Sequence, residues 1–280
     1  MIAIISSLKD KASINIKESL LNNFQFKESK EKFGGNLVYN YEIDGKEMNL
    51  YTVNSELIYT ENIDKKINAD IFIFISKHRA SEERKALTVH PIGNFGKAEF
   101  GGKEKMLCFS PSFLLKNIYM ELNKNSEEID YEATMEATHH GPFLEKPVLF
   151  LEVGSAEEQW EDKNAAKASA VSLINAIKNE NKEYENEKKW ESTFVIGGSH
   201  YNYVSNKAML KTNFAVGHIC AKYNLQNLDI LLIKQAMEKV LPKPKFVLLD
   251  WKGLGKEKRK LLELLESNNI AYQRSDKLFE

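Results

Sequence analysis

Six histidines supply most of the chemistry that this sequence offers. They fall in the segments "SKHRAS", "LTVHPIGN", "ATHHGP" and "IGGSHYNY…FAVGHIC", which contain His78, His90, His139, His140, His200 and His218. Nearly all lie within a few residues of Gly, Pro or Ser, so we expect them in turns. Imidazole titrates closest to neutral pH and is the commonest metal ligand in proteins. Histidines gathered at turns predict one histidine-rich site.

Two chemistries suit such a site, and the spacing leaves both open. In the first, a zinc ion takes three protein ligands and activates a bound water. The sequence offers His90, His139, His140, His200, Glu136 and Glu152 as ligands, although none of their spacings is a zinc signature. In the second, one imidazole is a general base on water and another orients it. The backbone N–H groups of Gly197 and Gly198 then stabilise an oxyanion.

Alternating strands and helices must position these side chains. Apolar and β-branched runs predict strands at 1–7, 69–78, 146–155, 192–200, 245–251 and 271–275, and Asp44-Gly45 predicts a hairpin over 36–54. Helical periodicity predicts helices at 9–24, 110–125, 156–179, 228–240 and 255–269. Ser110 with Pro111, and Ser155 with Glu158, are the expected helix starts.

This pattern predicts an α/β fold in which a mixed sheet carries helices on both faces. No internal repeat or long linker divides the chain, so we expect a single domain over residues 1–280. Polar residues follow several strand ends, at Ser76 and His78, Glu152 and Gly154, Gly197 to His200, and Asp250. Ligands bind outside the carboxyl ends of strands in open α/β sheets, so these side chains should converge on one crevice.

Composition limits the setting of that crevice. With 42% hydrophobic and 28% charged residues, the chain resembles an ordinary globular protein. No apolar run approaches the roughly 20 residues that span a bilayer, and the first residues lack a signal-peptide pattern. Cys108 and Cys220 have apolar neighbours and no CxxC spacing, which predicts buried thiols in a reducing compartment. We therefore expect a cytoplasmic protein without membrane contact.

One basic segment is a candidate anion site. The formal net charge of −1 gives no overall attraction to nucleic acid, so such a partner needs a local patch. Lys256, Lys258, Arg259 and Lys260 crowd the expected start of a helix, where cations are unfavourable unless an anion binds. The alternative is a solvated basic face with Lys and Glu paired along the helix. In the same way, Trp160 is interpreted as a core or groove residue in preference to a substrate-stacking one.

The motifs together resemble a known family. "SKHRAS", "LTVHPIGN", "EATHHGP", "LEVGSAEEQW", "GGSHY" and "VGH" occur in this order between about residues 70 and 220, and they contain every histidine. This combination resembles the archaeal and plant type of D-aminoacyl-tRNA deacylase. The resemblance implies hydrolysis of the ester between a D-amino acid, such as D-tyrosine, and the 3′-terminal ribose of tRNA. It also implies a zinc requirement and a fold similar to peptidyl-tRNA hydrolases and nucleoside phosphorylases.

Under this hypothesis each candidate residue has an expected role. The expected catalytic residues are His78, His90, His139, His140, Glu152, His200 and His218. Zinc would be held by His90, His139, His140 and His200. The substrate would contact Glu136 or Glu152 through its ammonium group, the turn at Gly197 and Gly198, and the RNA-facing Lys256, Lys258 and Arg259.

No obligate protein partner is expected, and the chain should act as a monomer. The alternatives are an enzyme resembling nucleoside phosphorylase or peptidyl-tRNA hydrolase, and a metal-dependent RNA-binding factor without turnover.

Overall fold

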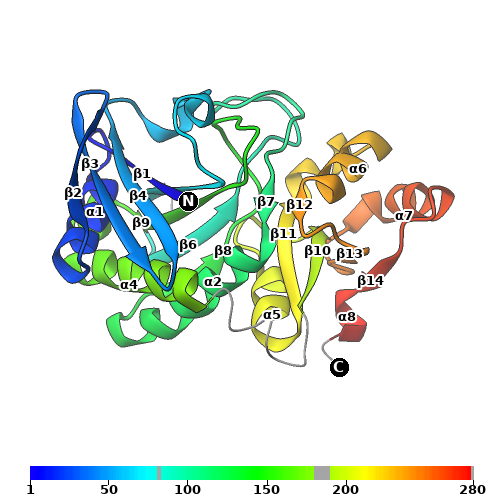
Figure 1. Cartoon of the computed structure of the whole chain (residues 1–280). Coiled ribbons are helices and arrows are strands. Elements are labelled where there is room, and N and C mark those ends of the chain that lie inside the picture. The colour runs from blue at the N-terminus through cyan, green and yellow to red at the C-terminus, as the bar shows by residue number, and fades with distance from the viewer. Residues whose placement is uncertain (81–82, 180–189, 279–280) are drawn as a thin grey trace.

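The computed structural model describes residues 1–80, 83–179 and 190–278, and it shows a mixed α/β fold (Figure 1). The strands form two main sheets where the sequence indicated one. An eight-stranded mixed sheet has the order β2-β3-β4-β1-β5-β9-β6-β8, and a four-stranded parallel sheet has the order β11-β10-β13-β14. A short parallel pair, β7 with β12, lies outside both.

The strands have the following bounds: β1 Ile2–Ser7, β2 Lys27–Phe33, β3 Asn36–Ile43, β4 Lys46–Val53, β5 Ile71–Arg79, β6 Ala86–Pro91, β7 Ser110–Pro111, β8 Glu132–Met135, β9 Val148–Ser155, β10 Glu191–Ile196, β11 Phe214–Cys220, β12 Val240–Leu241, β13 Phe246–Leu249 and β14 Tyr272–Arg274. The helices are α1 Lys11–Asn23, α2 Ser112–Ser126, α3 Glu157–Trp160, α4 Lys163–Asn179, α5 Tyr203–Lys211, α6 Ile230–Glu238, α7 Lys258–Ser267 and α8 Ser275–Leu278.

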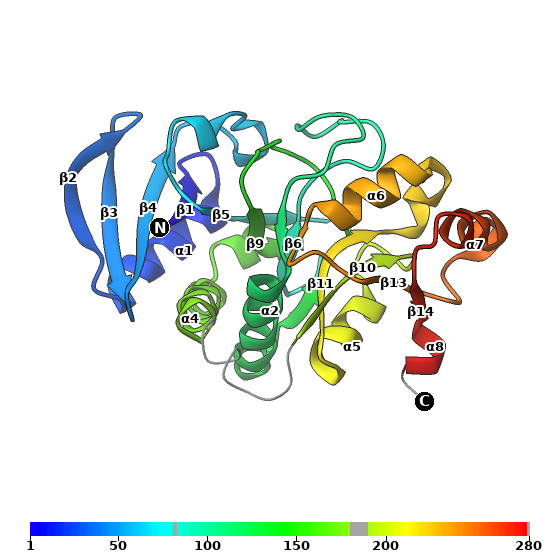
Figure 2. The same ribbon diagram turned by 45° about the vertical axis from the view of Figure 1, so that its right-hand side comes forward.

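Helices cover only one face of the large sheet. Side chains alternate between the two faces of a strand. Those of β1, β5 and β9 on one face join a core with α1, α2 and α4, and those on the other face join a core with loops. Figure 2 shows α2 and α4 beneath this sheet. The small sheet does carry helices on both faces, since α5 packs on one side and α6 and α7 lie on the other.

Several predicted elements are confirmed. The hairpin joins β3 to β4 with Asp44 and Gly45 at positive φ, 51° and 75°, the geometry that such a turn requires. The strand at 69–78 is β5, which lies in the middle of the large sheet. The strand at 271–275 is β14 and closes the small sheet as an edge. Cys108 and Cys220 are buried free thiols, as expected.

Two predicted helix starts are wrong. Ser110 and Pro111 pair with Val240 and Leu241 as β7, so α2 begins only at Ser112. Ser155 forms no capping box, because its hydroxyl bonds the backbone of Arg84. The helix expected there is instead broken into α3 and α4. Asp162 precedes α4, and its side chain accepts hydrogen bonds from the N–H groups of Asn164 and Ala165 at the start of that helix.

The histidines are less concentrated in turns than the sequence indicated. His78, His90 and His218 lie inside β5, β6 and β11. The strands β6, β8 and β11 have no counterpart among the predicted elements, because each is short or interrupted by polar residues. Among the described residues, no helix has the length and apolar character needed to cross a bilayer.

A buried lysine ties the two sheets together. Lys116 in α2 is only 2% exposed, and its Nζ donates hydrogen bonds of 2.7 and 2.9 Å to the carbonyl oxygens of Thr212 and Phe214 where β11 begins. Its ammonium group also lies 4.7 Å from the centre of the Trp190 ring. A buried charge is tolerated only when its hydrogen bonds are satisfied.

The substitution Lys116→Met should therefore lower the free energy of unfolding by about 2 kcal/mol, because charged hydrogen bonds are lost and two carbonyls lose their donor. Urea denaturation measures this change. Lys124→Met, on the exposed side of the same helix, is the control and should change the stability by less than about 0.5 kcal/mol. Equal effects of the two substitutions would contradict a stabilising role for Lys116.

Candidate functional site

Five histidines and two glutamates meet on the face of the large sheet that carries no helix. His78 from β5 and Glu152 from β9 come from two parallel strands, and His90 comes from β6, which runs antiparallel to β9. Glu136 follows β8, and His139 and His140 follow it in the same loop. His200 comes from the turn after β10 in the small sheet. The site therefore lies where strands of opposite direction end, not along a single carboxyl edge.

Glu136 is the centre of this group. It is fully buried, and its Oε2 is 2.9 Å from His200 Nε2 and 3.7 Å from His139 Nε2. Its other oxygen, Oε1, is 3.1 Å from His78 Nδ1 but makes no aligned hydrogen bond among the described residues. One carboxylate thus faces imidazoles on both of its sides.

Glu152 has a similar environment on β9, which β6 separates from β8. Its Oε2 lies 3.5 Å from His78 Nδ1 and 3.6 Å from His90 Nε2. Glu152 is 4% exposed and His90 is fully buried. Histidines therefore surround both carboxylates as ion-pair partners.

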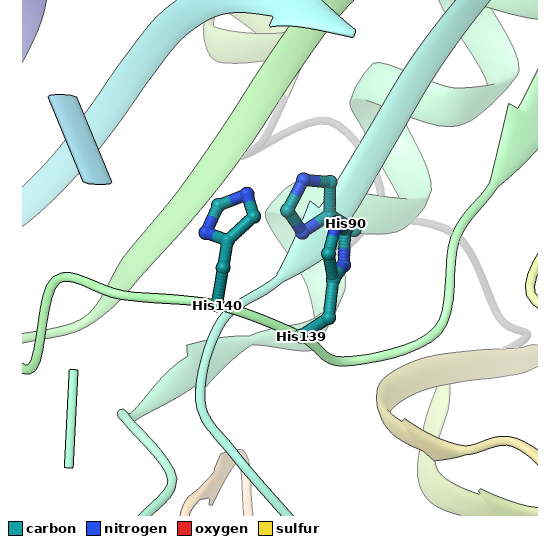
Figure 3. A group of neighbouring side chains, drawn as sticks. All are labelled: His90, His139 and His140. Atoms are coloured by element: carbon teal, nitrogen blue, oxygen red, sulfur yellow. The ribbon is translucent and has the colours of Figure 1, made fainter. Parts of the chain in front are cut away.

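His90, His139 and His140 present their rings to one another (Figure 3). The ring centres of His90 and His139 are 4.2 Å apart, and those of His139 and His140 are 4.3 Å apart. The Nδ1 of each ring lies close to a backbone carbonyl, at 3.1 Å from Pro91, 2.8 Å from Ala137 and 2.6 Å from Gly141. A carbonyl only accepts, so each Nδ1 carries the proton and each Nε2 of a neutral ring has a free lone pair.

Burial and the neighbouring charges give the histidines and glutamates of the site different pKa values. Burial, with the nearby His90, holds the pKa of His139 well below its usual value, and burial lowers the pKa of His140 to about 4. Burial also opposes charge on His78 and His90, but attraction to the carboxylates of Glu152 and Glu136 outweighs it and raises both pKa values. Burial would raise the pKa of Glu136 and Glu152, yet the surrounding histidines keep both well below the usual range. The carboxylates stay ionised and draw positive charge to themselves.

The residues fit a zinc ion by the chemistry of their donor atoms. Three sets offer ligand atoms within 4.8 Å of one another, namely His90 with His139 and His140, Glu136 with His139 and His200, and His78 with Glu136 and Glu152. His90 Nε2 and Glu136 Oε1 are buried and lack hydrogen-bonding partners among the described residues. A histidine that binds a metal through one nitrogen commonly donates the N–H of the other to a backbone carbonyl, and His90, His139 and His140 each have such a carbonyl near Nδ1. A cation is needed between His90 and Glu152, and either a proton or a metal ion supplies it.

Two aromatic residues to which the sequence gave no catalytic role hold His78 in place. The hydroxyl of Tyr201 lies 2.5 Å from His78 Nε2, and the indole N–H of Trp160 donates to the carbonyl oxygen of His78 at 2.9 Å. Trp160 is partly buried and packs against the core, in line with its interpretation from the sequence. Tyr201 belongs to the motif "GGSHY", but nothing in its spacing indicates the contact with His78, which is 123 residues away.

A cavity of about 410 Å³ opens above the histidines. His139, His140 and His200 lie at its base, and its walls come from residues 93–100 and from the 3₁₀ segment Lys222–Asn227. Gly141 lets the chain just after residues 93–100 approach, because a Cβ at Gly141 would lie 2.2 Å from the backbone nitrogen of Gly102. Glu136 and Glu152 do not line the cavity, which favours contact with imidazoles or a metal over contact with a substrate ammonium group.

His218 is apart from the other five histidines. Its ring is fully buried, with Nδ1 3.1 Å from the hydroxyl of Thr138 and Nε2 3.0 Å from the carbonyl oxygen of Cys108. It reaches the site only through Thr138, which precedes His139. Its placement supports a role in fixing the loop that carries His139 and His140.

The glycine turn after β10 has the expected backbone but only part of the expected chemistry. Gly197 and Gly198 have positive φ values of 108° and 85°. The N–H of Gly197 already donates to the carbonyl oxygen of Cys220 at 2.8 Å, so it is not available to an oxyanion. Neither glycine lines the cavity. Two further polar strand-end residues also stay apart, since Ser76 donates to Asp10 and Asp250 accepts from the N–H of Gly253.

The basic segment begins with a 3₁₀ turn, Gly255–Glu257, and Lys258 is the first residue of α7. Lys258 lies over the ring of Trp251 at 4.3 Å. Arg259 pairs with Glu263 at 2.8 Å, which is the pairing that the alternative of a solvated face expects. Lys256, Lys258 and Arg259 do not line the cavity, but Lys260 Nζ reaches the carbonyl oxygen of Gln226 in its wall at 3.3 Å.

Known proteins resemble this chain over nearly its whole length. A family model described as D-aminoacyl-tRNA deacylase matches residues 65–273. D-aminoacyl-tRNA deacylases of Pyrococcus abyssi and Archaeoglobus fulgidus are 35% and 32% identical, over 95% and 98% of this chain and 96% of theirs. A crystal structure of a conserved protein of unknown function is 32% identical, with a TM-score of 0.85 over 99% of this chain and 96% of that one.

The expected likeness to nucleoside phosphorylases stays a prediction. A methylthioadenosine nucleosidase of Campylobacter jejuni covers 64% of this chain and 98% of its own with a TM-score of only 0.42, at 13% identity.

The burial of His218 predicts a pH-dependent stability. Burial lowers the pKa of His218 to about 4, below the usual 6.5. The unfolded chain therefore binds this proton first, and folded-state stability is lost as the pH falls from about 6.5 toward 4, by about 1.4 kcal/mol per pH unit. His218→Gln cannot take up the proton, so urea denaturation should show a variant that is less stable at pH 7 but falls less steeply below pH 6.5. Parallel pH profiles would contradict this account.

Proposed function

The chain belongs to the D-aminoacyl-tRNA deacylase family, and on that premise we propose that it hydrolyses D-tyrosyl-tRNA and tRNA esters of similar D-amino acids. The attacking water is activated at the cluster of histidines and glutamates, with zinc as cofactor. The enzyme is a hydrolase of aminoacyl-tRNA ester bonds. The observation that carries the proposal is the position of His139, His140 and His200 at the base of a cavity, where His139 and His200 contact the buried carboxylate of Glu136.

The reaction requires one water molecule. Its oxygen forms a bond to the ester carbonyl carbon, the bond from that carbon to the ribose oxygen breaks, and a proton passes to the ribose oxygen. The products are the free D-amino acid and tRNA. The chain must therefore remove a proton from water and deliver one to the leaving oxygen.

The residues at the base of the cavity suit this task. His139 and His140 are neutral near pH 7, since burial lowers the pKa of both, so each has a lone pair for a water proton or a metal ion. His200 is fixed between Glu136 and Tyr223, with Nε2 2.9 Å from the carboxylate and Nδ1 3.0 Å from the phenol oxygen. Its side chain is 36% exposed, so it can reach a bound ester.

Zinc would be held by ligands from Glu136, His139 and His200, with His90 and His140 alongside. When bound, zinc lowers the pKa of water toward 7 and polarises a carbonyl oxygen. Glu136 and Glu152 contribute the negative charge that retains a divalent cation in a buried site. His78, held by Tyr201, orients Glu136 from the side opposite to His200.

We further propose that the chain acts as a single domain and as a monomer in the cytoplasm. All seven side chains of the cluster come from one chain, so the site needs no partner subunit. The substrate, charged tRNA, is present where translation takes place.

Release of amino acid from D-tyrosyl-tRNA and L-tyrosyl-tRNA tests this proposal. We expect hydrolysis of the D-ester only, loss of activity after chelation and recovery on addition of zinc. His139→Ala should reduce turnover about 100- to 10,000-fold, because it removes a neutral imidazole from the base of the cavity. Its affinity for uncharged tRNA should stay unchanged.

The outcomes separate the parts of the proposal. D-selective hydrolysis that survives chelation would remove zinc and leave the imidazoles as the acid and base. Equal hydrolysis of both esters would contradict D-selectivity. Absence of hydrolysis in every condition would contradict the proposed activity, and release of base from nucleosides or of peptide from peptidyl-tRNA would then identify the related activities.

The basic segment gives a separate prediction about RNA affinity. Lys258→Glu should weaken binding of tRNA and lower the slope of log affinity against log salt by about one, because one phosphate contact is lost. Arg259→Glu should have a smaller effect, since Arg259 already pairs with Glu263. Filter binding at several salt concentrations measures both slopes. Unchanged affinity in the Lys258 variant would exclude this segment from the RNA interface.

A further inference from the structure

Two aromatic side chains stand exposed at the cavity above the histidines. Phe100 is 64% exposed and Tyr223 is 53% exposed, and both line the cavity. They come from the two different walls, Phe100 from the loop after β6 and Tyr223 from the 3₁₀ segment Lys222–Asn227. Exposed aromatic rings at a cavity mouth are typical of surfaces on which bases stack.

Tyr223 is fixed by the site itself. Its hydroxyl lies 3.0 Å from Nδ1 of His200, whose Nε2 contacts Glu136 at 2.9 Å. The phenol end is thereby anchored while half of the side chain remains open to solvent. A ring held in this way loses little conformational freedom when a flat ligand stacks on it. A ligand stacked on this ring would be separated from His200 only by the ring of Tyr223.

The walls beside Tyr223 are polar and close-fitting. Asn227 donates from Nδ2 to Oδ1 of Asn224 at 3.1 Å, and both residues line the cavity. A Cβ at Gly96, on the opposite wall, would lie 2.8 Å from the same Nδ2 of Asn227, so the walls meet there. Amide groups next to an aromatic ring suit the hydrogen-bonding edges of an unpaired base.

Positive charge lies directly behind this wall. Lys260 donates to the carbonyl oxygen of Gln226 at 3.3 Å, and a Cβ built at Gly255 would lie 3.9 Å from the side chain of Lys222. The basic segment is therefore packed against the segment that carries Tyr223. Lys97 adds a further cation on the opposite wall. The phosphates of an RNA strand that enters the cavity from this side would meet these lysines.

We propose that Tyr223 is the stacking platform for the terminal base of an RNA 3′ end, placing the ester-bearing ribose over His200. This inference rests on the proposed function and names the part of its substrate that the site recognises. Because tRNA ends in an unpaired CCA, the stacked base is the terminal adenine. Tyr223 is thus a positioning residue, and its aromatic ring matters more than its hydroxyl.

Binding of uncharged RNA tests this role without any hydrolysis. The probe is a fluorescent acceptor-stem hairpin with a 3′-CCA end, titrated with the full chain, and a second hairpin lacks only the terminal base. Tyr223→Leu should weaken binding of the CCA hairpin about 5- to 100-fold, the range for one base on one aromatic ring. Tyr223→Phe should stay within about threefold of the wild type, because it keeps the ring.

The second hairpin and a control variant make the result specific. Loss of the terminal base should weaken binding by the wild type and leave Tyr223→Leu unaffected, since the stacking partner is already absent. Tyr203→Leu is the matched control, because Tyr203 is 72% exposed and does not line the cavity. It should bind both hairpins as the wild type does.

Three results would overturn the proposal: wild-type affinity for the CCA hairpin in Tyr223→Leu, an equal loss for both hairpins in that variant, or no binding of either hairpin by the wild type. Each is independent of the deacylation assay. Base-dependent loss of binding without D-ester hydrolysis would support the stacking role and remove the activity. Hydrolysis of the D-ester without base-dependent binding would support the activity and remove the stacking role.

Discussion

The site depends on the burial of two carboxylates among imidazoles. Glu136 and Glu152 are almost completely buried, and their ion-pair partners are His78, His90, His139 and His200. An ionised carboxylate in a protein interior is very unfavourable unless positive charge compensates it. Protonated histidines or a metal ion supply this charge. In either case the attraction to the carboxylates holds the loops that carry the histidines against the large sheet.

The fold around this interaction serves to bring distant segments to one face. Helices pack on the opposite face of the large sheet, so loops are free to cover the site. The small sheet adds His200 and Tyr223, and α2 and its buried Lys116 join it to the large sheet. In our proposal, Tyr223 on one wall binds the RNA and the histidines at the base of the same cavity act on its ester, with Tyr223 in contact with His200.

The sequence was sufficient for some features and not for others. The Asp44-Gly45 turn and the apolar strand β5 follow from local preferences, so both were predicted correctly. The histidine motifs singled out five residues that the fold brings together, because histidine is rare here and reactive, but they also singled out His218, which lies apart. The direction of β6 is set by its pairing with β9, which is a long-range contact, so the approach of His90 to Glu152 could not be predicted. Tyr201 and Tyr223 carry no local signal, because only the tertiary fold brings them to His78 and His200.

We propose above all that the buried carboxylates hold a zinc ion together with the neutral histidines. Anomalous diffraction at the zinc edge, from crystals of the protein purified without chelator, tests it most directly. We predict a peak about 2.0 to 2.2 Å from an oxygen of Glu136 and from imidazole nitrogens of the cluster. The absence of a peak near Glu136, or one bound only by residues outside the cluster, would contradict this account.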